Sequence, residues 1–149
     1  MNKTILITVI FALTGCVTGT RNYQEFSDGV GYKSEFTKDN IYRVSYIGTS
    51  TIGFKKLNDL VFLRSAELAI EKGYDYFIIT KSSNNRKQAP NFSGGVGVIS
   101  VPSQKPWRES NLVIKLFKFD PGGEVYNARQ VEATLKEKYN INDIGDIGV

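Results

Sequence analysis

The chain has 149 residues, 41% hydrophobic and 12% aromatic, which is typical of a globular domain and argues against wholesale disorder. It contains no histidine and one cysteine, which excludes a Ser-His or Cys-His nucleophile and a disulfide framework, and argues against a zinc, iron or copper site. The formal charge of +4 is mildly basic and favours anionic surroundings without selecting a partner.

The first 15 residues predict a signal peptide. Lys3 precedes an apolar run from Ile5 to Leu13, which is too short to cross a bilayer, and a small-residue site follows. We therefore expect an exported protein from which residues 1–15 are removed. Export makes nucleic acid an improbable partner.

The end of this segment, Leu13-Thr14-Gly15-Cys16, resembles a bacterial lipobox. The resemblance implies that Cys16 becomes the N-terminus and carries a diacylglycerol and an N-acyl chain such as palmitate, with no other cofactor. Two or more acyl chains hold a protein stably at a membrane. The alternative for Cys16 is a buried thiol. Val17, in place of an aspartate, favours the outer membrane, with the protein facing the periplasm. Residues 16–28 would then form the lipidated N-terminus and a tether.

Residues 29–140 are predicted to form one α+β domain. Tyr32–Phe36 and Ile41–Gly48 form a hairpin in this interpretation, and Arg43 lies on the wetter face of its second strand. Helical spacing of apolar residues predicts a helix over 54–72, with Gly73 ending it.

A strand over 74–80 follows this helix. The order strand, helix, strand predicts a right-handed crossover between two parallel strands. Residues 82–109, with their glycines and prolines, are predicted to be a long irregular segment, a kind that is usually functional.

A further strand is expected over 111–119, and a second helix over 128–139 with Asn127 as its N-cap. Residues 141–149 are expected to be a frayed tail. Together the elements predict about four strands in a mixed sheet, with two helices mainly on one face and one β-α-β crossover.

Arg64 and Glu67 are the first candidate site, because residues three apart are neighbours on a helix surface. Arg64 also falls in line with apolar helix positions, so its guanidinium is expected to be partly buried. A structural ion pair is the favoured interpretation, and a polar notch for a ligand is the alternative.

Basic and aromatic residues in or beside the long segment are the second candidate. Arg86, Lys87 and Trp107 lead this set, which also contains Lys81, Phe92, Lys105 and Arg108. Such residues are favoured at interfaces and could contact an envelope protein or an anionic envelope polymer. The alternative is a solvated loop.

Five tyrosines could instead form a stacking platform for cell-wall sugars, although aromatic residues in strands more often fill the core. They are Tyr32, Tyr42, Tyr46, Tyr74 and Tyr76.

Three segments resemble a family of small, uncharacterised proteobacterial envelope lipoproteins: Tyr42-Arg43-Val44, the R-x-A-E-L run at Arg64–Leu68, and Gly73-Tyr74-Asp75-Tyr76-Phe77. The resemblance covers roughly residues 29–135 and supports location and fold, but it implies no activity. We therefore expect a non-enzymatic lipoprotein held at the membrane as an adaptor, sensor or structural module. The alternative is a binding module for a small envelope or cell-wall ligand.

Overall fold

The computed structural model describes residues 23–87 and 107–141. Cys16, the signal peptide, the middle of the long segment and the tail beyond Ile141 lie outside the described residues. The elements are β1 (Gly31–Lys38), β2 (Ile41–Thr49), α1 (Phe54–Glu71), β3 (Tyr76–Lys87), β4 (Trp107–Phe117), β5 (Tyr126–Asn127) and α2 (Ala128–Tyr139).

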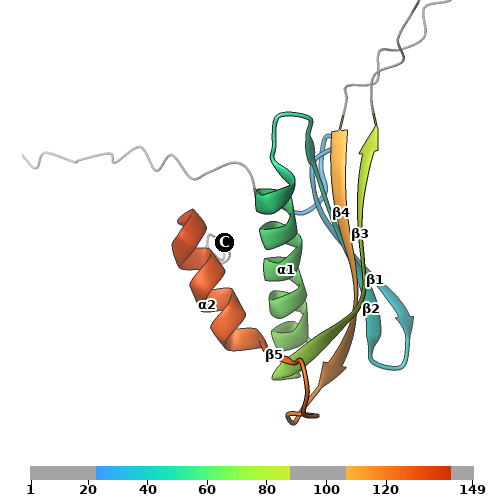
Figure 1. Cartoon of the computed structure of the whole chain (residues 1–149), viewed down its shortest axis with the longest axis vertical. Helices are drawn as coiled ribbons and strands as arrows, with labels where there is room; N and C mark the ends of the chain where they lie inside the picture. The colour runs from blue at the N-terminus through green and yellow to red at the C-terminus, as the bar shows by residue number, and fades with distance from the viewer. Residues whose placement is uncertain (1–22, 88–106, 142–149) are drawn as a thin grey trace, which may run out of the picture.

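The strands form one sheet in the order β1-β2-β4-β3-β5, and every neighbouring pair is antiparallel. Both helices lie on the same side of this sheet, with α1 between the sheet and α2 (Figure 1). The α+β class and the placement of the helices are therefore as predicted. The described sheet has five strands and not four, because Tyr126–Asn127 adds a short edge strand.

The connection from β2 through α1 to β3 differs from the predicted crossover in one respect, the strand that lies between β2 and β3. β2 and β3 both run antiparallel to β4, so they are parallel to each other, as expected. They are not neighbours, because β4 returns between them. The prediction of a mixed sheet is wrong for this reason.

β3 and β4 are longer than predicted. β3 continues to Lys87 and β4 begins at Trp107, and the two strands stay paired to those ends. The prediction of an irregular segment is therefore wrong for residues 82–87 and 107–109. Beyond Thr80 every residue of β3 is exposed, so the strand lacks the alternation that marks a half-buried strand.

α1 is apolar over much of its circumference because it is covered on two sides. Leu57, Leu60, Val61 and Leu63 are almost fully buried, and Ser65 satisfies its hydroxyl by donating to the Val61 carbonyl oxygen at 2.8 Å. A helix that packs on a sheet and on another helix needs such a broad apolar surface.

α2 is fixed at both ends. Asn127 accepts a hydrogen bond from the Gln130 backbone N–H at 3.1 Å, which confirms the predicted N-cap. At the other end, Lys138 Nζ and Tyr139 Oη each lie 2.6 Å from Asp59 Oδ2 on α1. These contacts hold α2 along α1.

Candidate functional site

The N-terminal segment enters the domain at Tyr23. The Tyr23 ring stacks on the Tyr46 ring, with centroids 6.0 Å apart, and its centroid lies 5.3 Å from that of the Tyr32 ring. Its hydroxyl donates a hydrogen bond to Glu67 on α1. Tyr23 thus packs against the domain although it lies six residues before residue 29, where the domain was predicted to begin.

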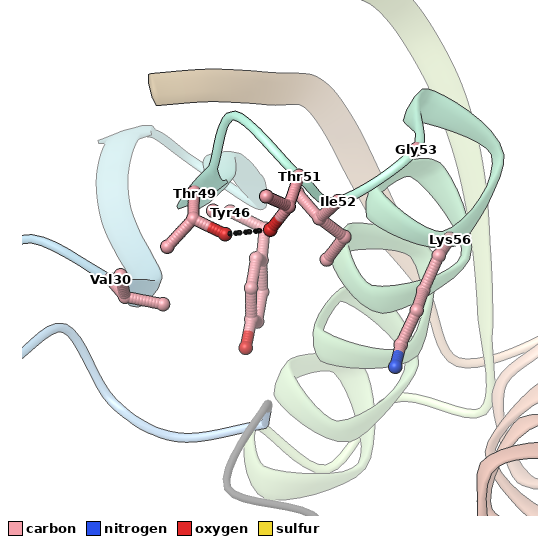
Figure 2. Close-up of a pocket in the computed structure, with 8 residues that line it drawn as sticks. Val30, Tyr46, Thr49, Thr51, Ile52, Gly53 and Lys56 are labelled. Atoms are coloured by element: carbon pink, nitrogen blue, oxygen red, sulfur yellow. Dashed lines mark hydrogen bonds between the residues drawn. The ribbon is translucent and has the colours of Figure 1, made fainter. Parts of the chain in front are cut away.

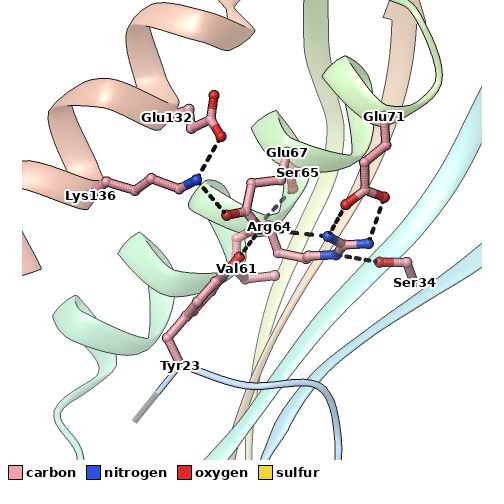
Figure 3. Close-up of polar contacts among 9 residues, drawn as sticks. All are labelled: Tyr23, Ser34, Val61, Arg64, Ser65, Glu67, Glu71, Glu132 and Lys136. Carbon is pink, nitrogen blue, oxygen red and sulfur yellow. Dashed lines mark hydrogen bonds and ion pairs between the residues drawn. The ribbon is translucent and has the colours of Figure 1, made fainter. Parts of the chain in front are cut away.

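Arg64 lies beside this contact but has a different main partner from the one expected. Its Nη1 and Nη2 donate to the two carboxylate oxygens of Glu71 at 2.6 and 3.0 Å, whereas Glu67 is 3.5 Å away (Figure 3). Nε donates to Ser34 Oγ at 3.2 Å, and the guanidinium lies 4.5 Å from the Tyr32 ring centre. Only 12% of the Arg64 side chain is exposed, so the expected partial burial is confirmed.

Glu67 joins the N-terminal segment to both helices. Besides the Tyr23 hydroxyl, it faces Lys136 Nζ of α2 at 3.4 Å, and Lys136 also contacts Glu132 at 2.8 Å. We call Tyr23, Arg64, Glu67, Glu71, Glu132 and Lys136 the α1 polar cluster; Figure 3 shows them converging from the N-terminal segment and the two helices.

Two pKa shifts follow from the packing of this cluster. Burial, and then the charge and hydrogen bond of Glu67, raise the pKa of Tyr23 far above its usual value. Burial opposes the charge on Arg64, but its hydrogen bonds and attraction to Glu71 outweigh that effect and raise its pKa. Both shifts favour the ordinary states of these two groups, a protonated Tyr23 and a charged Arg64, as in a structural network.

A shallow cavity of about 280 Å³ lies at the start of α1 (Figure 2). Its walls include Thr49 and Thr51, whose hydroxyls are 2.8 Å apart, and the aliphatic and ammonium parts of Lys56. The Tyr46 ring lines the cavity, and burial raises its pKa to about 12.

The basic residues predicted to act together are divided between two faces of the sheet. Lys87 is in register with Trp107, so these two share one face. Arg86 is in register with Arg108 on the other face, where both guanidinium groups approach the Phe54 ring, at 5.5 and 5.4 Å. The structure therefore brings Lys87 and Trp107 together and separates them from Arg86.

The face of the sheet opposite the helices carries a second depression, of about 220 Å³. We call this side the open face. The depression is lined by Arg43, Lys81, Ser83, Asn85, Asn111 and Val113. Apart from Lys81, none of these residues is among the candidate site residues predicted from the sequence, although the alternation in β2 predicts Arg43 on the wetter face.

The five tyrosines do not form one platform. Tyr46 is buried, Tyr32 packs on Tyr23, and Tyr42 meets Phe36 edge-on at 5.5 Å. Tyr76 is in register with Phe117 on the open face, and Tyr74 packs against the core beneath the sheet. The interpretation of these rings as core and sheet-packing residues accounts for most of them.

Within the described ranges, no group of three or more histidine, cysteine, aspartate or glutamate residues gathers where it could hold a metal ion. None of the helices in those ranges combines the length and apolarity needed to cross a membrane. Comparison with known proteins finds no matching family model, no matching curated protein and no matching solved structure.

Proposed function

We propose that this protein is a bacterial envelope lipoprotein, anchored through lipid on Cys16, that acts as a non-enzymatic adaptor or structural module. The observation that carries the proposal is the lipobox-like Leu13-Thr14-Gly15-Cys16 directly after a short apolar run. Tyr23, which makes the first contact with the domain among the described residues, comes only seven positions later. This spacing suits a domain held close to its anchor. The outer membrane, facing the periplasm, is the location that Val17 favours.

The non-enzymatic assignment is supported by the chemistry of the chain. Histidine is absent from the sequence, and the one thiol is assigned to the lipid. The Arg64 and Glu67 side chains, which are only 12% and 14% exposed, are engaged with Glu71, Tyr23 and Lys136. A small ligand at Arg64 and Glu67 would have to displace these internal partners, so the adaptor function is the better supported of the two expectations.

The anchor is tested by expressing the full chain in a Gram-negative host with an alkyne-tagged palmitate. We expect the label on the wild-type protein, a mass equal to residues 16–149 plus three acyl chains and glycerol, and recovery in the membrane fraction. Cys16→Ser should lose the label and the membrane association, whereas the control Thr18→Ser should keep both. Unlabelled wild-type protein that retains residues 1–15 would overturn the proposal.

A further inference from the structure

The open face is covered by neither helix, because α1 and α2 both lie on the other side of the sheet (Figure 1). Apolar residues, among them Ile41, Ile78 and Phe117, share this face with a polar centre. The strand register places its residues in rows across β2, β4 and β3. One row is Arg43, Val113 and Lys81, and the next is Ser45, Asn111 and Ser83. The depression lies where these two rows meet.

The charge of these three strands on the open face is strongly unbalanced. Four cations, Arg43, Lys81, Lys87 and Lys115, share the face with one carboxylate, Glu109. Glu109 already accepts a hydrogen bond from Asn85 at 3.2 Å, and Glu35 of β1 is in register with Arg43. Neither Arg43 nor Lys81 forms an ion pair with another residue of the described ranges, and both are exposed. The charge favours an anionic partner.

The row beside these cations has the hydrogen-bonding groups that sugars need. Ser45 and Ser83 present hydroxyls and Asn111 presents an amide, and each such group can both donate and accept. A sugar hydroxyl also does both, so the two sets are complementary. Val113 is the one apolar side chain in these two rows, and the isoleucines of the flanking rows, Ile41, Ile47 and Ile78, are kept apart by Lys115 and Glu109. The polar centre differs from the apolar centre that typifies a protein–protein interface.

We propose that the open face binds an acidic polysaccharide that carries carboxylate groups. Arg43 and Lys81 pair with the carboxylates, and the Ser45–Asn111–Ser83 row hydrogen-bonds the ring hydroxyls. The polysaccharide lies along β4 toward Trp107, whose indole offers an apolar surface to a sugar ring. This inference goes beyond the proposed function, on which it relies only for placing the domain where such polymers occur.

The test measures binding of a galacturonate octamer to the full chain, purified in a non-ionic detergent, by titration calorimetry at low salt. We expect the octamer to bind and its neutral methyl ester to bind at least about tenfold more weakly, because the ester cannot form charge-assisted hydrogen bonds. The double variant Arg43→Gln/Lys81→Gln should show a similar loss. Arg129→Gln/Lys72→Gln, which removes the same charge from exposed sites outside the depression, should bind as the wild type does.

A further variant separates sugar recognition from simple attraction of anions. Asn111→Ala should weaken binding of the octamer by about fivefold and leave the binding of a polyphosphate of equal charge unchanged. Circular dichroism and thermal unfolding should match the wild type for Arg43→Gln/Lys81→Gln, because both side chains are exposed.

Three results would overturn the inference: no binding of the octamer, equal binding by the wild type and Arg43→Gln/Lys81→Gln, or polyphosphate or anionic phospholipid vesicles binding as tightly as the octamer. Occupation of the face by a second copy of the chain would also overturn it, and sedimentation would reveal such a dimer. A failure of the anchor proposal would instead appear as missing lipid on Cys16. The binding of the octamer is measured independently of that lipid, so the two failures can be distinguished.

Discussion

Tyr23 connects the segment that leads from Cys16 to the folded domain. Its ring packs on Tyr46 and Tyr32, and its hydroxyl reaches Glu67, which in turn faces Lys136 of α2. One side chain therefore links the N-terminal segment, the sheet and both helices. Truncating this side chain should therefore weaken the contacts of the N-terminal segment with the sheet and with the helices.

We predict that Tyr23→Phe lowers the free energy of unfolding by about 2 kcal/mol at neutral pH, as is typical for a lost hydrogen bond to a charged group. The raised pKa of Tyr23 adds a dependence on pH. Up to about pH 10 the phenol keeps its proton in both the folded and the unfolded state. Above that pH it ionises only in the unfolded chain. The contribution of the hydroxyl to the free energy of unfolding is therefore lost as pH rises, by up to about 1.4 kcal/mol per pH unit.

Denaturant unfolding at pH 8, 9.5 and 11 measures this effect. The difference in stability between the wild type and Tyr23→Phe should shrink from pH 9.5 to 11. A difference that stayed constant over this range would show that the Tyr23 hydroxyl is not held in a protonated, buried contact.

The ion pairs at the residue scale could be predicted from the sequence only in part. The i,i+3 spacing pointed to Glu67 as the partner of Arg64, but Glu71, two turns along the same face, is the closer one. Both carboxylates lie within reach of a long side chain. The choice between them is set by Tyr23 and Lys136, which approach Glu67 from distant parts of the sequence.

At the scale of the elements, the connection from β2 to α1 is tightly packed. Gly48 lies on the helix-facing side of β2, and a Cβ built there would come within 2.5 Å of Ile52 Cγ2 and 2.8 Å of Leu57 Cδ1. These atoms belong to the start of α1 and the loop before it. Gly48 thus sets how closely the helix approaches the sheet.

We predict that Gly48→Ala destabilises the domain by about 1–3 kcal/mol, the usual cost of overpacking a core. Gly53 is a matched control, because nothing lies within 4 Å of a Cβ at that position. Gly53→Ala should change the stability by less than about 1 kcal/mol. Thermal unfolding of both variants measures the difference, and Gly48→Ala should have the lower melting temperature. Equal melting temperatures would contradict close packing at Gly48.

Helices were more predictable than strands at this scale. The bounds of α1 and α2 follow from apolar spacing, Gly73 and the Asn127 cap, all of which are local signals. The outer half of β3 is a run of polar residues held by pairing with β4, a contact made 24 residues away at Asn85 and Glu109. That pairing, and hence the opposite directions of Arg86 and Lys87, could not be obtained from the composition of the segment.

At the scale of the whole molecule, the order of the strands is the part least accessible from sequence. Strand, helix and strand fix the directions of β2 and β3, but several topologies allow a later strand to pair between them. The structure inserts β4 there, which places Arg43 and Lys81 on either side of Val113. The candidate surface therefore depends on a long-range arrangement.

The core residues of the described ranges, 23–87 and 107–141, pack on one another as one cluster, and we expect the fold to survive replacement of residues 88–106. Joining Lys87 to Trp107, which are already paired, through Asn-Gly gives a two-residue hairpin turn suited to the twist of the strands. We predict a melting temperature within a few degrees of the wild type. Loss of the cooperative transition would show instead that residues 88–106 contribute to the fold.

The packing of Tyr23 against the domain also limits the distance between the domain and the membrane. With lipid on Cys16 as proposed, only seven residue steps separate the anchor from the docked tyrosine, and a fully extended chain covers about 25 Å in that distance. The segment between the anchor and Tyr23 is therefore no longer than the width of a small domain. The protein would work as a surface-bound module whose reach ends close to the membrane, so the polymer or protein that it meets must come to within that distance.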